Sequence, residues 1–318
     1  MEKRSKLDDV ARAAGVSRTA ASRVINGMPG STDAVRSRVL EAARQLGFQP
    51  HAAARALASG RSDRARSETI EILIVDPDPN ALSAKPYYGR VMTGAARAVG
   101  GEDVTIRLRL LSAPPVDDDE PPFGRILINM PAAAAGRLNR RRTVALGRSA
   151  DDIPFVAPDN AGGAQQAAAH LVTTGRRCIG AVFGPAMPCA DERKAGFLRT
   201  VGDAGQSVVA AGGDFTGSTA YALTLRLLAL RPDLDAIFAA CDVTAGGVLR
   251  ALRETGRRVG HDVAVVGFDG SVLAEVADLS SVYAPVEEEA ALAVRKLFDP
   301  ELPTTRRLPT TLAVRGSS

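Results

Sequence analysis

The sequence predicts an α/β protein with an all-α head, in which three short helices precede a two-lobed body of parallel sheets flanked by helices. Residues 1–50 show helical apolar periodicity that is broken by tight turns. From residue 70 onward, short apolar runs alternate with helical patterns, which is typical of parallel sheets covered by helices. That alternation lasts for roughly 250 residues, which favours two lobes over one sheet.

The head is expected to hold three helices. Leu7, Val10 and Ala11 share one face of the first helix, and Gly15 can adopt the left-handed conformation that ends it. Ser17 is a natural N-cap for the second helix. The third helix has an apolar stripe made of Val35, Val39, Ala42 and Leu46.

Residues 7–26 have the layout of a helix-turn-helix motif, because a glycine-containing turn joins the first helix to a second one with polar residues near its start. Such a second helix fits the major groove of DNA. The candidates for reading base edges are Arg18, Thr19 and Arg23. The candidates for phosphate contacts are Ser17, Ser22 and Asn26. An arginine bonded to guanine contributes about 1–3 kcal/mol of discrimination. The spacing alone also fits a generic three-helix domain with scattered arginines.

Charge is unevenly placed along the 318 residues. The first 66 residues hold 13 basic and 6 acidic side chains, a net charge of +7, whereas the whole chain carries only +4 and the remainder therefore −3. A basic head on a mildly acidic body suggests that the head meets a polyanion. Charge alone fits a solvated basic face equally well.

The body is predicted from its strands and helices. The expected strands are Ile70–Val75, Arg125–Asn129, Thr143–Leu146, Cys178–Phe183, Ala236–Ala239 and Val263–Gly267. The expected helices are Tyr88–Val99, Gly162–Thr174, Glu192–Ala204, Ser218–Ala229, Thr244–Glu254 and Val286–Leu297. Residues 112–124 are rich in proline and aspartate, so the helix expected between two strands is missing or reduced there.

Other functional classes fit less well. The three cysteines are sparse, and with neither a secretory signal nor a membrane-length apolar run they favour the reducing cytoplasm. A small-molecule binding protein without DNA contacts would leave the basic head unexplained. An enzyme is disfavoured because the common phosphate-binding and nucleophile motifs are absent and the three histidines lack metal-ligand spacing. No cofactor and no metal are expected.

Ordered motifs run through the whole chain. The head contains L-D-D-V-A-R-A-A-G-V-S, S-R-V-I-N and L-G-F-Q-P, and the next segment is A-A-A-R-A-L-A. The body contains P-D-N-A-G-G, E-R-K-A-G-F, G-D-F-T, D-A-I-F-A-A-C-D, D-V-A-V-V-G-F-D and L-P-T-T-L-A-V-R-G-S-S. In these motifs the sequence resembles the LacI/GalR family of transcription regulators, whose body is of the periplasmic-binding-protein type.

The resemblance implies a homodimer that binds a pseudo-palindromic, double-stranded operator, usually as a repressor. Its domains would be a helix-turn-helix head at 1–50, a hinge helix at 51–61, a linker at 62–69 and an effector-binding and dimerisation domain at 70–318. Lobe 1 would comprise about 70–157 and 284–300, and lobe 2 about 158–283 and 301–318. Leu57 would wedge into the minor groove, unless it packs on its own domain. Arg55 would contact a phosphate or remain a solvated linker charge.

The resemblance also places a small-molecule effector, a sugar or a related polar metabolite, between the lobes. The implied contacts are Arg193, Asp269, Phe215, Asp159, Tyr87, Tyr88 and Cys241. Arg193 could instead be a surface charge, and Phe215 or Tyr88 part of the core. Cys241 stands where the family commonly has asparagine, and a thiol is a poor hydrogen-bonding group. This departure argues against a standard hexose and leaves open a smaller or less polar ligand, or a lost response.

Overall fold

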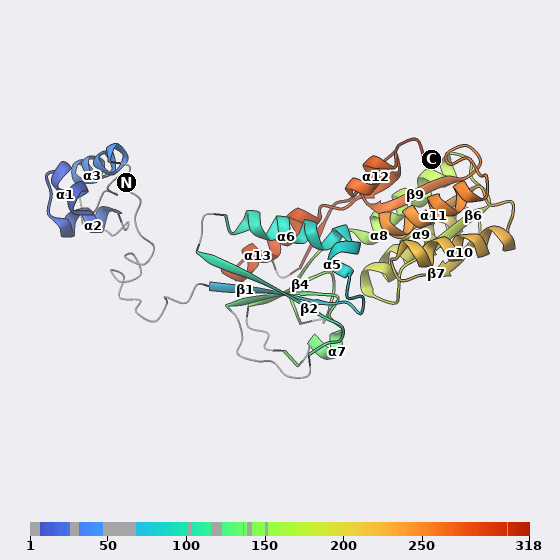
Figure 1. The fold of residues 1–318 in the computed structure, drawn as a ribbon, viewed down its shortest axis with the longest axis horizontal. Coiled ribbons are helices and arrows are strands. Elements are labelled where there is room, and N and C mark those ends of the chain that lie inside the picture. Colours follow the sequence, from blue (N-terminus) through green and yellow to red (C-terminus); the bar gives the residue numbers. More distant parts are fainter. Residues whose placement is uncertain are drawn as a thin grey trace. The chain divides into compact units, whose positions relative to one another are not determined.

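The computed structural model describes residues 7–25, 32–46, 68–100, 103–115, 123–135, 137–138, 142–149, 152–303 and 305–318. The chain forms two compact units, Met1–Glu68 and Thr69–Ser318. They are referred to below as the head and the body (Figure 1). None of the helices in the described ranges is both long and apolar enough to span a bilayer.

The head contains three described helices: α1 (Leu7–Ala13), α2 (Arg18–Ile25) and α3 (Asp33–Gln45). Val10, Ala21 and Val39, one from each helix, are fully buried against one another. Gly15 ends α1 with φ +59°, as the sequence predicted. The backbone amide of Val16 then donates to the Ala11 carbonyl at 3.0 Å, which closes the turn that leads into α2.

Lobe 1 of the body is a six-stranded sheet in the order β11-β5-β4-β3-β1-β2. Its strands are β1 (Glu68–Val75), β2 (Val104–Leu111), β3 (Gly124–Ile128), β4 (Thr143–Leu146), β5 (Phe155–Pro158) and β11 (Thr305–Leu308). Its helices are α5 (Ala81–Ala84), α6 (Pro86–Ala98), α7 (Ala132–Ala135) and α13 (Val286–Phe298). Helices α6 and α13 cover one face of the sheet, and α7 lies on the other side (Figure 1).

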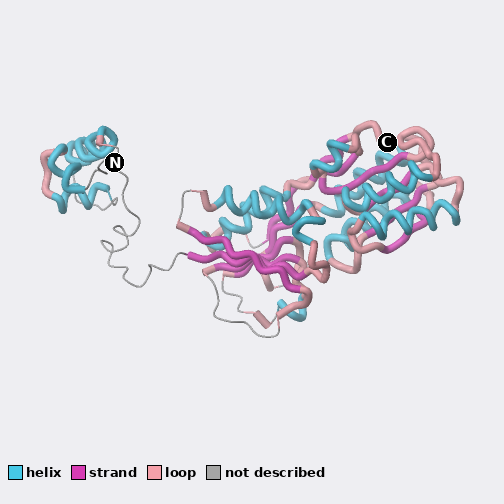
Figure 2. The backbone as a smooth tube through the Cα atoms, in the orientation of Figure 1, coloured by secondary structure: helices cyan, strands magenta, loops and turns pink. Residues whose placement is uncertain are grey.

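Lobe 2 is a second six-stranded sheet in the order β12-β10-β9-β8-β6-β7. Its strands are β6 (Ile179–Phe183), β7 (Val208–Gly212), β8 (Ala236–Ala239), β9 (Ala264–Asp269), β10 (Ser280–Tyr283) and β12 (Thr311–Ala313). Its helices are α8 (Asn160–Thr173), α9 (Pro188–Asp203), α10 (Gly217–Leu230), α11 (Asp242–Glu254) and α12 (Val272–Val276). The strands lie between the helices in Figure 2.

Alternating side chains on the lobe 2 strands explain why helices are needed on both faces. Phe238 on β8 packs with α8 and α9, whereas its neighbour Ile237 packs with α10 and α11, and both are fully buried. Successive strand residues point to opposite faces, so a sheet apolar at every position must be covered twice.

The chain crosses between the lobes three times: after β5, after β10 and after β11. Strand β11 pairs in parallel with β5, from Thr305 opposite Phe155 to Leu308 opposite Pro158. It therefore belongs to lobe 1, although the sequence placed residues 301–318 in lobe 2. Only β12, antiparallel to β10, returns to lobe 2, so the last crossing falls after Leu308. The sequence did not reveal β11 because the strand has only four residues and its exposed arginines interrupt the apolar pattern.

The predicted strands and helices of the body all form, with ends shifted by a few residues. The helix expected to be missing after β2 is indeed not present at residues 112–115, and 116–122 lie outside the described residues. Short elements such as β5, β7 and α12 were not predicted, because four or five residues carry too little periodicity to recognise.

Candidate functional site

The first candidate surface is the outer side of α2 in the head. The Ser17 hydroxyl accepts a hydrogen bond from the Ala20 backbone amide at 3.2 Å and so caps the helix, as predicted. Ala21 and Val24 point inward, with exposed fractions of 0% and 4%, whereas Arg18 in the first turn is exposed. The helix thus turns its amino-terminal end outward, as a helix entering a major groove must.

The other DNA-contact candidates stay predictions. Three of them, Thr19, Ser22 and Arg23, lie on α2, where the structure describes the backbone only. The remaining three, Asn26, Arg55 and Leu57, lie outside the described residues.

The second candidate site lies where the two lobes meet, and its centre is Arg193 on α9. This side chain is almost completely buried. Its Nε donates to Asn160 Oδ1 at 2.9 Å, and its Nη1 donates to the Ala240 carbonyl at 2.6 Å and to Asp269 Oδ1 at 3.1 Å. The guanidinium also lies over the Phe268 ring, 3.7 Å from its centroid. The structure thus brings Arg193 and Asp269 together as a mostly buried ion pair.

Asp269 is one of two neighbouring carboxyl groups in lobe 2. It ends β9 with φ +103°, a conformation that a non-glycine residue adopts only when its surroundings hold it there. Asp242 accepts hydrogen bonds from the Ser271 amide and the Ser281 hydroxyl, both at 2.6 Å. Burial and the nearby Asp269 raise the pKa of Asp242 to about 6. Burial also raises the pKa of Asp269, against the lowering effect of Arg193.

Cys241 lies beside this pair but is committed to the structure of α11. Its Sγ accepts from the Thr244 amide at 3.4 Å and lies 3.1 Å from the Thr244 hydroxyl, so it caps the helix. Burial raises the pKa of Cys241 to about 12, which keeps the thiol protonated at neutral pH. The sulfur therefore has little hydrogen-bonding capacity left for a ligand.

Lobe 1 contributes Tyr87 and Glu289 to the junction. Burial, followed by the proximity of Glu289 and Cys189, raises the pKa of the Tyr87 hydroxyl. Glu289 is 1% exposed, and its Oε2 atom has no hydrogen-bond partner among the described residues. Burial raises the pKa of Glu289 to about 8, even though Arg193 and the Gly147 amide lower it. Glu289 is therefore largely a neutral acid at pH 7.

Two further residues predicted to contact the effector already have partners within the fold. Asp159 caps α8, accepting from the Gly162 amide at 3.0 Å. The Tyr88 hydroxyl donates to Asp76 at 2.6 Å and accepts from Asn129 at 2.9 Å, and the side chain is buried. Burial raises the pKa of Tyr88 well above its usual range.

Phe215 packs at the end of β6 in lobe 2. A Cβ atom at Gly184 would lie 2.3 Å from the Phe215 ring, so the ring needs a glycine beneath it. The residue adopts φ +64° in the left-handed region, and its side chain stays partly exposed. This placement beside the start of α9 keeps Phe215 a candidate for stacking on a ligand.

Sequence reasoning missed Asp242, Glu289, Cys189 and Asn160. Glu289 had a readable signal, because it lies three residues after Val286 and four before Ala293, on the apolar face of α13. A glutamate on such a face is unusual and calls for an explanation. Asp242 lies three residues after the end of β8, at the edge where carboxyl ends of parallel strands commonly carry ligand contacts.

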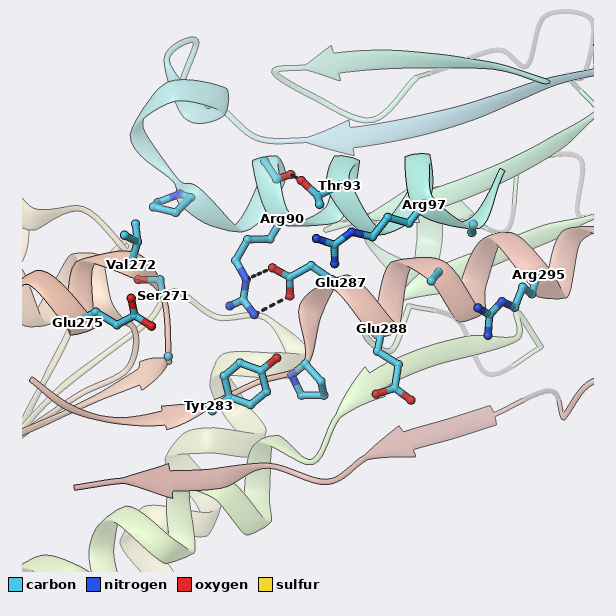
Figure 3. Close-up of a pocket in the computed structure, with 16 residues that line it drawn as sticks. Arg90, Thr93, Arg97, Ser271, Val272, Glu275, Tyr283, Glu287, Glu288 and Arg295 are labelled. Carbon is cyan, nitrogen blue, oxygen red and sulfur yellow. Dashed lines mark hydrogen bonds and ion pairs between the residues drawn. The ribbon is translucent and has the colours of Figure 1, made fainter. Parts of the chain in front are cut away.

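A third feature is a groove of about 840 Å³ between α6, α13, α12 and β10. Figure 3 shows Arg90 at its centre, paired with Glu287. Arg90 Nε and Nη2 donate to the two Glu287 carboxylate oxygens at 2.8 and 2.7 Å, and Nη1 donates to the Asp269 carbonyl at 2.9 Å. Arg90 therefore connects this groove to the residue that pairs with Arg193.

Comparisons with known proteins show which family the chain resembles. Residues 6–51 match the family described as bacterial regulatory proteins, lacI family, and residues 168–318 match the periplasmic binding protein-like domain. The chain is 34% identical to the HTH-type transcriptional regulator CelR of Thermobifida fusca, over 94% of this chain and 93% of that protein. It is 31% identical to the ribose operon repressor of Halalkalibacterium halodurans, over 98% of this chain and 96% of that protein.

Solved structures show the same likeness. The structure described as a transcriptional regulator CelR–cellobiose complex superposes with a TM-score of 0.69 at 30% identity, covering 99% of this chain and 100% of that one. A lac repressor dimer bound to operator and an anti-inducer superposes with a TM-score of 0.68 at 21% identity, covering 99% of each chain, which supports the fold alone.

Proposed function

Because the chain belongs to the lacI family of bacterial regulatory proteins, we propose that it binds a pseudo-palindromic operator as a homodimer and that a small polar effector between its lobes changes its DNA affinity. The observation that carries this proposal is the three-helix head, in which a serine-capped α2 exposes Arg18 at its first turn. Repression is the expected outcome, as in the ribose operon repressor.

The head would read DNA through α2. Its first turn would enter the major groove, where Arg18, Thr19 and Arg23 are placed to meet base edges. Ser17, Ser22 and Asn26 would set the register on phosphates. The hinge residues Arg55 and Leu57 would add a phosphate contact and a minor-groove wedge.

A homodimer follows from the symmetry of such an operator, and the body offers a surface for it. On α12, Val272 and Val276 have exposed fractions of 61% and 84%, and Tyr283 on β10 is 45% exposed. These side chains adjoin or line the groove around Arg90. Exposed apolar side chains gathered beside a groove favour a protein contact. We propose this face as the two-fold dimer interface.

The dimer surface can be tested with a matched pair of substitutions. Val276→Asp should weaken dimerisation at least tenfold in sedimentation equilibrium, because it places charge on an apolar contact. Leu230→Asp, at a residue 68% exposed on α10, should leave the dimer intact. Equal dimer stability in both variants would remove this face from the proposal.

The effector would bind at the junction of Arg193, Asp269 and Tyr87. The names of the relatives mention cellobiose and ribose, which supports a sugar or a related polar metabolite as the ligand class. A ligand that changes the Arg193–Asp269 pair would disturb Asp269, whose carbonyl holds Arg90 in the groove. Movement between the lobes would thus reach the dimer face and the head.

A gel-shift experiment with promoter fragments from the gene's own operon tests the proposed function. The full-length protein should shift one fragment at low nanomolar concentration, and an excess of the same unlabelled fragment should compete while random duplex should not. Arg18→Ala should reduce specific binding far more than non-specific binding. Equal competition by random duplex would refute the proposal.

A further inference from the structure

The Glu289 side chain at the lobe junction has a buried oxygen atom without a hydrogen-bond partner among the described residues. It lies in the first turn of α13 and is 1% exposed, yet its Oε2 atom has no hydrogen-bond partner in the part of the chain that the structure describes. The Gly147 backbone amide lies near the carboxyl group and lowers the pKa of Glu289, but this amide already donates to the Val156 carbonyl at 2.8 Å. A buried polar atom without a partner is destabilising, so its retention needs a reason.

The surroundings of Glu289 come from both lobes. Tyr87 of lobe 1 and Cys189, Arg193 and Asp269 of lobe 2 all interact with it electrostatically. Among the described residues, the Tyr87 hydroxyl forms no hydrogen bond, and Arg193 donates through Nε and Nη1 but not through Nη2. Glu289 thus interacts electrostatically with two side chains that each keep a donor without a hydrogen bond in the described residues, as expected of ligand-contacting groups.

Acidic groups outnumber the available cations at this junction. Asp269 and Glu289 both interact with Arg193, Asp242 lies beside Asp269, and Arg90 is already paired with both carboxylate oxygens of Glu287. Neutral sugar hydroxyls do not require this excess of acid. A positively charged ligand group would stabilise the ionised form of Glu289 and would form a charge-assisted hydrogen bond with its free Oε2 atom.

We propose that Glu289 binds a protonated amine of the effector, so that the ligand is a small hydroxylated amine such as an amino sugar. This inference rests on the proposed function, in which the lobe junction is the effector site. The ammonium group would pair with Glu289, while hydroxyl oxygens of the ligand would accept from Arg193 Nη2 and the Tyr87 hydroxyl. Binding would release the carboxyl proton of Glu289 to solvent, and no covalent bond would change.

The test uses sugars that differ only by one amine. Full-length protein is titrated calorimetrically with glucosamine against glucose and with galactosamine against galactose, in two buffers of different ionisation enthalpy. We expect at least one amino sugar to bind at least tenfold more tightly than its neutral partner, with proton release that shows as a buffer-dependent heat.

Two neighbouring substitutions separate Glu289 from the general acidity of α13. Glu289→Gln keeps the shape and should lose at least tenfold in amino-sugar affinity together with the proton release. Glu288→Gln, at an exposed position of the same helix, should keep both. Circular dichroism and thermal unfolding should show both variants folded.

Three results would overturn the inference: equal affinity for amino and neutral sugars, amino-sugar binding that survives Glu289→Gln, or no binding of any of the four probes. Binding of neutral sugars would leave the proposed function standing. The operator gel shift without ligand tests that function independently, so the failure of one is distinguishable from the failure of the other.

Discussion

The two lobes contribute to their junction in different ways. On the lobe 2 side, Arg193 donates to Asp269 and to a backbone carbonyl, and Asp242 accepts from two serines. On the lobe 1 side, Glu289 is buried and Tyr87 is partly buried, but Glu289 Oε2 and the Tyr87 hydroxyl lack partners in the described chain.

This difference suggests that the two lobes have different roles in ligand binding. The lobe 2 side is preorganised, since its charges keep their places without a ligand, and preorganised groups bind with little ordering cost. The lobe 1 side has hydrogen-bonding atoms without partners in the described residues. A ligand that bonds to these atoms and also to lobe 2 needs both lobes close to it. A ligand that satisfies both sides would therefore favour one lobe arrangement over others.

The largest effect is expected from removing the lobe 2 cation. Arg193→Ala should destabilise the protein by about 3–5 kcal/mol, because it leaves the mostly buried Asp269 without its ion-pair partner. Arg199→Ala, at an exposed position of the same helix, should change stability by less than about 0.5 kcal/mol. Urea unfolding of both variants measures this, and similar midpoints would contradict the preorganised lobe 2.

The helix that carries Arg193 is held by a close contact. A Cβ atom at Gly196 would lie 2.3 Å from the Ala161 carbonyl oxygen of α8, whereas Gly202 has open space around it. Gly196→Ala should therefore destabilise by about 1–3 kcal/mol. Gly202→Ala should stabilise the protein by about 0.5–1 kcal/mol, because Gly202 lies within α9 and glycine is less favourable than alanine inside a helix. Thermal unfolding that ranks the two variants the other way would contradict this packing.

Lobe 1 should respond to pH through Glu289. Its pKa rises from 4.5 to about 8 on folding, so between these values the unfolded chain ionises the group while the folded chain keeps the proton. Stability from this group is therefore present below pH 4.5 and is lost as pH rises toward 8. Without ligand, Glu289→Gln should be more stable than the parent by on the order of 1 kcal/mol at pH 8, with the gain vanishing near pH 4.5. A pH-independent difference would show that Glu289 is not buried as an acid.

Substitution of the two adjacent tyrosines should give one moderate and one very small effect. Tyr88→Phe should cost about 1–2 kcal/mol, because the Asp76 carboxylate loses a buried donor. Tyr87→Phe should cost less than about 0.5 kcal/mol, because that hydroxyl has no hydrogen bond in the described residues. Chemical denaturation compares them, and equal losses would mean that Tyr87 has a structural partner.

The sequence predicted the fold class, the long helices and most of the buried strands, since each of these has several turns or residues of periodic pattern, whereas β2, whose side chains alternate between partly buried and exposed in its first half, was not among the expected strands. It also led to Arg193 and Asp269 by resemblance, and the structure pairs them. It could not show that Tyr88, Asp159 and Cys241 are already bonded within the fold, because the partners of Tyr88 are distant in the sequence and the other two depend on local helix caps. Glu289 was missed because its meaning depends on residues of the other lobe.

The most direct test of the central claim is the ratio of specific to non-specific DNA affinity. Fluorescence anisotropy of the full-length protein at physiological salt would compare the selected operator with a scrambled duplex of equal length and composition. We predict at least about a thousandfold preference for the operator. Equal affinity for the two duplexes would contradict the central claim.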